Sequence, residues 1–311
     1  MSQFSAITLD LSRFPTPLAI RGVDFETILD ERKVRLVDLL HEAGVDYDVG
    51  NLEFDPAVIL EETDAYRELL VYAAINDAYR AGLIAFAVGS DLDHLGLTAA
   101  LGLPQPHRDL MLRRVIVPAS GSTPAVMEND AEYRRRLLLA PEAYATAGTE
   151  GGFLFHALSA DPGVINADVW SPSLGEVQIA IQARDGLAAA SADLVEAVRR
   201  HMHRKDVKPL TDMVSVRSVT THDYQIDVTV FIRPGPDPAA VRVAVEDGLA
   251  AMAASRRMPA RDVPRSAIVA AASAGPVDRV SVAAPLADVV MGDGELAVCT
   301  GIAVNVETHD G

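Results

Sequence analysis

Residues 224–232 read YQIDVTVFI and show the clearest strand pattern in the chain. Apolar residues occupy every second position: Tyr224, Ile226, Val228, Val230 and Ile232. The positions between them include Gln225, Asp227 and Thr229. Because successive side chains of a strand point to opposite faces, this alternation predicts a strand with one buried face. Asp237-Pro238 follows as a predicted N-cap and first helical proline, so the strand is expected to pack against a helix.

The same pairing of strands with a covering helix recurs upstream. Strands are expected at VINADVW (164–170), EVQIAIQA (176–183) and MVSVRSV (213–219), with a helix at about 192–205. Further strands are expected near 277–283 and 300–307, and a short helix near 264–273. We predict an α+β multidomain chain, in which an N-terminal helical bundle segment precedes small α/β sandwich-like domains with mixed sheets. The expected parts are an extended arm (1–23), a helical region (24–109), a middle domain (110–220) and a C-terminal domain (221–311).

The longest predicted helix runs from Asp55-Pro56 to about Gly82. A helix that packs on a single core normally keeps a wide polar face, but the apolar residues here cover more than one stripe. Either this is the central helix of its own domain, or it also packs against a partner helix or another chain. The second interpretation predicts a partner interface at Tyr66, Leu69, Leu70, Tyr72, Ile75 and Tyr79.

Composition limits the classes of partner. The formal net charge of -17 disfavours a nucleic-acid surface and an anionic membrane surface, since both require clustered Lys and Arg. Cys299 is the single cysteine, which excludes an internal disulfide and a cysteine-rich metal site. The first residues, MSQFSAITLDLSRFP, lack the pattern of a signal peptide. We therefore expect a chain made in the cytoplasm, with no metal and no cofactor.

The stretch YATAGTEGGFLFHALSADP (144–162) raises the question of a phosphate-binding loop. No strand leads directly into it, no Lys-Ser/Thr pair follows Gly152, and Glu150 would repel an anion. Gly148 suits the left-handed end of the preceding segment, and Glu150 suits the first turn of a helix. We interpret the glycines as a hinge.

Three groups of polar residues are candidates for a catalytic, metal-binding or partner-binding site. His156 and Ser159 could touch on one helix with Asp161 nearby, but nothing there resembles a nucleophile elbow, so a packing histidine is favoured. His201 and His203 point about 200° apart on a helix and cannot share a metal. The basic stretch around them is interpreted as a solvated helix end or as a contact with an acidic protein. The basic run 134–136 is interpreted either in the same way or as a contact with an acidic protein.

Six stretches together resemble the baseplate assembly protein J family of contractile phage tails. They are DFETILDERKVRLVDLL, EETDAYRELLVYAAINDAYRAGLIAFAVGSDLDHLG, YRRRLLLAPEAYATAGTEGGFLFHALSADP, DVKPLTDMVSV, DYQIDVTVFIRPGPDP and CTGIAVNVE. The stretches occur in the order found in that family, and the resemblance covers nearly the whole chain.

The resemblance implies a non-enzymatic wedge subunit that forms the ring around the hub and relays its shape change to sheath contraction. It makes 24–109 a wedge or dimerisation region and places the protein in the virion, at the tail baseplate, assembled in the bacterial host cytoplasm. The implied partners are a second copy of the chain, a tail protein I-like wedge partner, a sheath-initiating lysozyme-like protein and hub or spike proteins. A soluble cytoplasmic hydrolase using His156 and Asp161, and an adaptor that forms no ring, remain the alternatives. Bacteriocin-like and gene-transfer particles use the same family.

Overall fold

The structure is a computed structural model of the 311-residue chain. It describes residues 24–47, 55–100, 114–117, 119, 124–144, 148–184, 189–273 and 275–309. The predicted arm 1–23 and the predicted boundary near residue 110 lie outside these residues. The chain forms two compact units, divided between Ala99 and Ala100, and each is described by itself.

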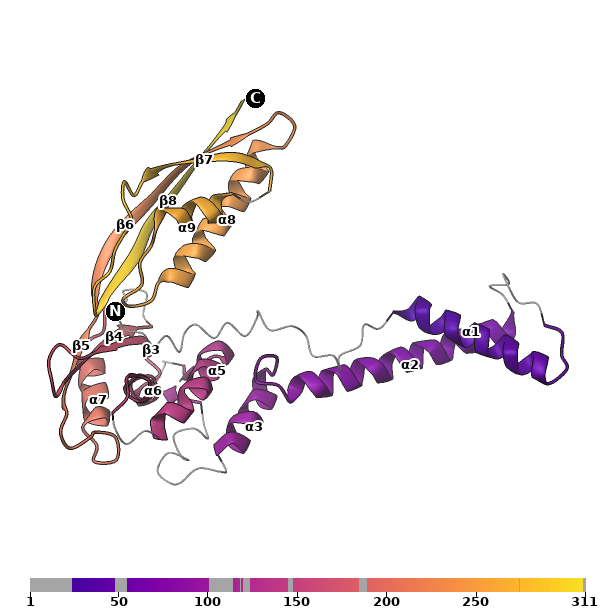
Figure 1. Cartoon of the computed structure of the whole chain (residues 1–311), viewed down its shortest axis with the longest axis horizontal. Coiled ribbons are helices and arrows are strands. Elements are labelled where there is room, and N and C mark those ends of the chain that lie inside the picture. The colour runs from indigo at the N-terminus through magenta and orange to yellow at the C-terminus, as the bar shows by residue number, and fades with distance from the viewer. Residues whose placement is uncertain are drawn as a thin grey trace. The chain divides into compact units, whose positions relative to one another are not determined.

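The first unit is helical, with α1 (Phe25–Glu42), α2 (Pro56–Ala81) and α3 (Gly89–Ala100). The Asp24 side chain accepts the Thr27 N–H at the start of α1, and Asp55 accepts the Ala57 N–H at the start of α2. The long helix predicted from Asp55-Pro56 is thus confirmed. Helix α1 lies along the first part of α2 (Figure 1), and the two share a small apolar core. Its members are Ile28, Leu29 and Ala65, with Phe25, Leu69 and Tyr72 at its margin.

The second unit begins with a short hairpin and two helical segments. These are β1 (Ile116–Val117), β2 (Val126–Met127), α5 (Asp130–Leu139) and the 3-10 helix η2 (Ala140–Tyr144). The Asn129 side chain and Glu132 form a reciprocal capping box at the start of α5. Helix α5 ends at Leu139, two residues before Pro141, which has no N–H to donate to a helical hydrogen bond and lies within η2.

The middle layer is a three-stranded sheet with helices on one face. Its strands are β3 (Val164–Trp170), β4 (Glu176–Ala183) and β5 (Met213–Ser218), in the order β3-β4-β5. Strand β4 pairs antiparallel with β3 and parallel with β5. Helices α6 (Glu150–Ala160) and α7 (Ala192–Met202) supply residues such as Phe155 and Met202 to a core shared with the sheet. The three predicted strands are confirmed.

The C-terminal layer repeats this arrangement with longer strands. It contains β6 (Thr220–Ile232), β7 (Val277–Ala284) and β8 (Glu295–Thr308), in the order β7-β6-β8. Helices α8 (Pro238–Arg256) and α9 (Arg265–Ala272) lie on one face of the sheet (Figure 1). The five apolar residues of YQIDVTVFI are all buried against these helices, while Gln225 and Asp227 are exposed. The alternation therefore predicted both the strand and its buried face, and the α+β class with mixed sheets is confirmed.

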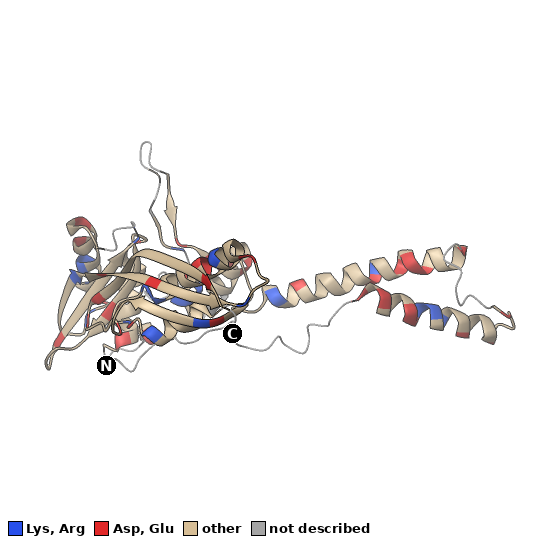
Figure 2. Cartoon of the chain, turned by 90° about the horizontal axis from the view of Figure 1, so that it is seen from above, with Lys and Arg blue, Asp and Glu red and all other residues tan. Residues whose placement is uncertain are grey.

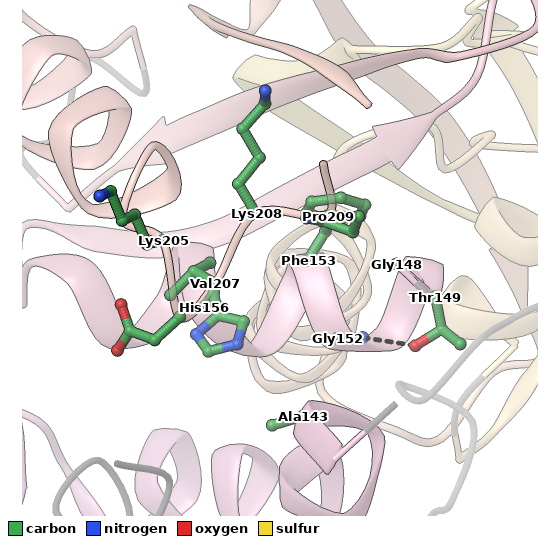
Figure 3. A pocket seen from close by; sticks show the side chains of 11 residues that line it. Ala143, Gly148, Thr149, Gly152, Phe153, His156, Lys205, Val207, Lys208 and Pro209 are labelled. Carbon is green, nitrogen blue, oxygen red and sulfur yellow. Dashed lines mark hydrogen bonds between the residues drawn. The ribbon is translucent and has the colours of Figure 1, made fainter. Parts of the chain in front are cut away.

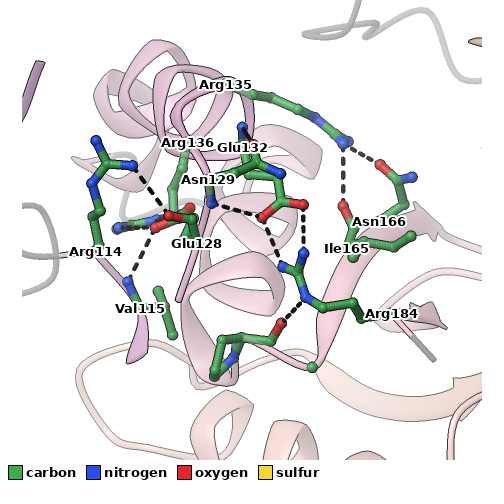
Figure 4. Close-up of polar contacts among 12 residues, drawn as sticks. Arg114, Val115, Glu128, Asn129, Glu132, Arg135, Arg136, Ile165, Asn166 and Arg184 are labelled. Atoms are coloured by element: carbon green, nitrogen blue, oxygen red, sulfur yellow. Dashed lines mark hydrogen bonds and ion pairs between the residues drawn. The ribbon is translucent and has the colours of Figure 1, made fainter. Parts of the chain in front are cut away.

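Buried and half-buried ion pairs join α5 to its surroundings (Figure 4). Arg136 and Glu128, whose side chains are only 1% and 7% exposed, form an ion pair of 2.8 Å between Nη2 and Oε2. Arg184 of the loop after β4 holds both carboxylate oxygens of Glu132, at 2.8 and 2.7 Å. Arg135 donates to the Asn166 side chain on β3. The basic run 134–136 was interpreted as a solvated or partner-facing patch, and this was wrong for Arg136, which is an internal structural residue.

Candidate functional site

Helix α2 exposes apolar side chains along its length. Of its 26 residues, all of which the structure describes, only Val58, Ala65 and Asn76 are buried. At 1.5 Å per residue the helix is about 39 Å long. A helix of that length in a stable monomer normally buries a continuous apolar stripe. Helix α2 therefore buries only a small part of its apolar side chains.

The six residues predicted as a partner interface fall into two groups. Leu69 and Tyr72 are half-buried at the margin of the core shared with α1. The other four are exposed: Tyr66 (55%), Leu70 (50%), Ile75 (55%) and Tyr79 (44%). The sequence could not separate these groups because both have helical spacing. Their role in binding a partner stays a prediction.

Three more exposed residues extend this surface and are absent from the predicted set. These are Ile59, Leu60 and Val71. With 100° per residue, Ile59, Tyr66 and Leu70 fall on one side of α2, whereas Leu60, Val71 and Ile75 fall on another. Spacings of 7 and 4 residues in the first set, and of 11 and 4 in the second, are the sequence signal that identifies them. We call the six residues the α2 apolar surface.

A charged cluster links α1 to α2 beside this surface. The Arg32 guanidinium of α1 contacts Glu61 at 2.8 Å, Asp64 at 3.2 Å and Glu68 at 3.0 Å. Burial works to lower the pKa of Arg32, but the hydrogen bonds to Glu68 and Glu61 and the nearby carboxylates together raise it above its usual value. One positive charge thus faces three negative ones, and the cluster keeps a negative charge.

The glycine stretch before α6 forms a helix start and not a phosphate-binding loop. Gly148 has a left-handed φ of +68°, as its predicted position at the end of the preceding segment requires. Thr149 is the N-cap, and its Oγ1 accepts the Gly152 N–H at 3.1 Å and donates to Glu142 at 3.2 Å. The start of the helix thus already carries a hydroxyl cap and a carboxylate of this chain. Whether the segment acts as a hinge stays a prediction.

A cavity of about 160 Å³ lies beside this helix start, and both Lys205 and Lys208 line it. Figure 3 shows these two side chains directed away from Thr149. The lysines therefore do not converge with the helix N-terminus on a common anion site.

His156 is buried on α6, as expected for a packing residue. Its ring lies 5.7 Å from the His201 ring, measured between centroids. Asp161 accepts the Gly163 N–H at 2.7 Å in the turn that ends α6. The described contacts of Asp161 are therefore those of a turn residue, and they do not include His156.

His201 and His203 occupy different environments. Burial, followed by the positive charge of Arg204, lowers the pKa of His201 to about 4. His203 is exposed and forms the C-cap of α7, which ends three residues before the predicted boundary. The interpretation of both histidines as a solvated helix end was therefore wrong for His201. Within the described ranges, no group of three or more His, Cys, Asp or Glu side chains could hold a metal ion.

In the described part of the chain, the helices also lack the features of a membrane span. None of the helices there combines the length and the apolar character that crossing a bilayer requires.

Comparison with known proteins gives two family matches and a full-length relative. Residues 53–102 match the Baseplate J-like N-terminal domain, and residues 224–305 match the Baseplate J-like protein C-terminal domain. The chain is 38% identical over 298 residues to "Baseplate protein J" of Escherichia phage P2, covering 94% of this chain and 95% of that protein. The N-terminal match includes all of α2, and the C-terminal match includes most of the β7-β6-β8 layer. The chain therefore belongs to the baseplate J-like family.

Proposed function

We propose that this chain is a wedge subunit of a contractile tail baseplate and that the α2 apolar surface joins it to its wedge partners. Membership of the family makes the chain a structural protein of a phage tail baseplate. The proposal adds that its wedges form the ring around the hub. It also adds that the ring relays its change of shape to sheath contraction.

The observation that supports this role is the exposure of large apolar side chains on two sides of α2. Leu60 is 67% exposed and Val71 57%, besides the residues of the predicted interface. Exposed apolar patches of this extent mark protein–protein contacts in soluble proteins. Each of the two sides carries apolar residues at helical spacing, so each side can pack against a separate neighbouring helix.

The proposed partners are a second copy of the chain, a tail protein I-like wedge protein, the sheath-initiating lysozyme-like protein and the hub or spike proteins. The virion is the proposed site of action, after assembly in the host cytoplasm. The proposed role is structural and not catalytic. The support for this comes from the family and from Asp161, whose carboxylate accepts the Gly163 N–H in the turn that ends α6.

The experiment replaces exposed residues only. The double variant Leu70→Glu, Ile75→Glu changes one residue on each side of α2, while Leu69 is left intact because it packs toward α1. Particles are produced with this variant as the sole copy of the chain and are inspected by electron microscopy. Tails without a six-fold plate, or arrest before the plate forms, are the expected result.

Val243→Glu is the matched control, because Val243 is an apolar residue of α8 that is 51% exposed. This variant is expected to assemble normally. Normal plates from the α2 double variant would refute the proposed role of the α2 apolar surface. A small discrete complex without six-fold order in the wild type would favour the adaptor alternative.

A further inference from the structure

Strand β8 forms one border of the C-terminal sheet. Of the described strands, it pairs with β6 alone. The Ile232 carbonyl of β6 accepts the His309 N–H at 3.0 Å, so the backbone of His309 faces β6. Successive residues of a strand direct their N–H and C=O groups to opposite edges. The residues that face away from β6 are therefore Ile302, Val304, Val306 and Thr308. Within the described part of the chain, no hydrogen bond reaches their outward N–H or C=O groups.

The edges of β3 and β7 differ from this one, because an arginine side chain donates to the backbone of each. On β3 a bulge at Ile165 interrupts the ladder, and its carbonyl accepts a hydrogen bond from Arg135 at 3.5 Å. On β7 the Val282 carbonyl accepts Arg265 at 2.8 Å. Bulges and charged side chains of this kind keep a further strand from joining a sheet. The described residues of β8 from Ile302 onward carry neither device.

The same edge is apolar. The residues IAVNVET (302–308) include no Lys, Arg or Pro, and Glu307 is their single charge. Ile302, Val304 and Val306 pack against the core of the C-terminal layer but remain partly exposed. Figure 2 shows few charged residues on the long strands of this sheet. An added strand would cover these side chains and pair the outward backbone groups.

The arm 1–23, although outside the described residues, contains a segment whose sequence fits this edge. The segment is AITLDLS (6–12), and its apolar residues alternate with polar ones at Ile7, Leu9 and Leu11. Such alternation is typical of a strand with one buried face. The segment is as long as the exposed stretch of β8 and has one charge, Asp10. Charge opposition between the two segments is therefore limited to Asp10 and Glu307, and Arg13 follows the segment to offset it.

We propose that residues 6–12 of a second copy join the outer edge of β8 as an added strand. The inference takes the second copy from Proposed function and concerns a surface separate from α2. In this mode of binding, main-chain hydrogen bonds supply affinity and alternate side chains supply specificity. The apolar side of the arm segment would continue the layer of Val304 and Val306. Asp10 would lie with the exposed Asn305 on the opposite face of the sheet. Because each copy gives one arm and receives another, the contact extends from copy to copy, as a ring requires.

The first experiment measures binding of a labelled peptide with the sequence of residues 3–14 by fluorescence anisotropy. The receptor is the full-length chain with Leu9→Asp, whose own arm no longer competes. Leu70→Glu and Ile75→Glu are included to remove association through the α2 apolar surface. A control peptide in which Leu9 and Asp10 are exchanged keeps the composition and loses the alternation. The native peptide is expected to bind at least about tenfold more tightly than this control.

A proline in β8 tests which edge is used. Val304→Pro removes an N–H that faces away from β6, so the ladder with β6 is retained while the added strand loses a partner. It is expected to weaken peptide binding at least about tenfold. The matched control is Val282→Pro, which alters a partly buried valine of β7, the other border strand, and should leave binding unchanged. Circular dichroism checks that both variants fold.

N-methylated peptides test the same hydrogen bonds without altering the chain. In an added strand the N–H groups of Leu9 and Asp10 point in opposite directions, so only one of them faces β8. N-methylation of one is expected to abolish binding, and N-methylation of the other should change the affinity by less than about twofold.

A capture experiment decides whether the strand comes from a second copy. All chains carry Leu70→Glu and Ile75→Glu. A tagged chain with Leu9→Asp keeps the edge, and an untagged chain with Val304→Pro keeps the arm. Capture of the untagged chain is expected to be at least about fivefold greater than in a pair whose members both carry Leu9→Asp.

Equal binding of the native and exchanged peptides, unchanged binding to Val304→Pro or the same effect of both N-methylations would each overturn the inference. Peptide binding without capture would show that the arm docks on its own chain, which overturns the assignment to a second copy. Capture between two Leu9→Asp chains that Val304→Pro abolishes would make β8 of a second copy the occupant. Failure of the proposed function is separate, because it is decided by whether particles of the Leu70→Glu, Ile75→Glu variant build a plate.

Discussion

The backbone N–H of Gly294 donates a 2.7 Å hydrogen bond to Oδ2 of Asp168, a residue 126 positions earlier in the chain. Asp168 lies on β3 of the middle sheet, and Gly294 precedes β8 of the C-terminal sheet. Partial burial raises the pKa of Asp168, whereas the hydrogen bond from the Gly294 N–H lowers it. Around it, Arg217 stacks over the Trp170 ring at 5.0 Å and donates to the Asp293 carbonyl at 3.2 Å.

The same contact region is closed by apolar packing. Ala180 of β4, Val219 and Leu296 of β8 form a buried cluster between the two sheets. Val219 is also the single residue that connects β5 to β6. The two sheets are thus joined by a one-residue connection, a buried cluster and a charge-assisted hydrogen bond, and we call this contact region the sheet junction.

Gly294→Ala is expected to destabilise the sheet junction. Gly294 has a φ of +71°, and an added Cβ would lie 2.8 Å from Cη2 of Trp170, 3.0 Å from the Ala180 Cβ and against the Arg217 guanidinium. Left-handed backbone and overpacking together are expected to lower the free energy of unfolding by at least about 2 kcal/mol. Urea unfolding of the full chain measures this loss.

Gly275→Ala provides the control for the backbone effect alone. Gly275 has a similar φ of +65° but nothing within 4 Å of its added Cβ. Its substitution is expected to cost about 1 kcal/mol. Equal losses in the two variants would show that close packing at the junction contributes nothing.

Arg136→Met is expected to be among the most destabilising single changes in the second unit. The substitution leaves Glu128 charged and buried without its 2.8 Å partner, and breaking a buried pair in this way costs about 3–5 kcal/mol. Adding Glu128→Gln removes the buried charge and should recover about 1–3 kcal/mol. Thermal unfolding of the single and double variants tests this. A double variant less stable than Arg136→Met alone would contradict the prediction.

Acid is expected to weaken the packing of α7 through His201. Its pKa is about 4 in the folded chain against the usual 6.5 of histidine, so between these values the unfolded chain binds a proton that the folded chain does not. The contribution of His201 to the free energy of unfolding is therefore fully present above pH 6.5. It falls by at most about 3 kcal/mol as the pH drops toward 4.

His201→Gln should remove this part of the pH dependence, whereas the exposed His203→Gln should retain it. The measurement is the urea midpoint of each variant at several pH values from 4 to 7. An unchanged slope in His201→Gln would show that other groups cause the loss.

Leu69 and Leu70 form a matched pair on α2 for separating folding from assembly. Leu69 packs at the margin of the core with α1, so Leu69→Ala should lower the stability of the helical unit by about 1–2 kcal/mol. Leu70 is 50% exposed, so Leu70→Ala should change stability by less than about 0.5 kcal/mol and yet reduce incorporation into particles. Circular dichroism and quantitative immunoblotting of purified particles give the two measurements. Full incorporation of Leu70→Ala would argue against a contact at this residue.

Local patterns predicted the elements because the information lies within a few residues. The alternation of YQIDVTVFI specifies β6 and its buried face, and the Asp-Pro pairs at 55–56 and 237–238 specify the starts of α2 and α8. Boundaries were less accurate: α7 ends at Met202, and β8 begins at Glu295, before the expected position near 300. Pairing with β6 extends β8 in this way, since its first residue pairs with Thr220.

The sequence by itself determined the α+β class, the order of helices and strands and the long apolar α2, because side-chain periodicity is a local property of the chain. Only the tertiary structure decided that Leu69 is half-buried while Leu70 is exposed, that Arg136 is buried and that His201 is half-buried. It also decided that Asp168 meets Gly294. Burial depends on which distant segments come into contact, and no spacing within one helix or strand encodes a neighbour 126 residues away.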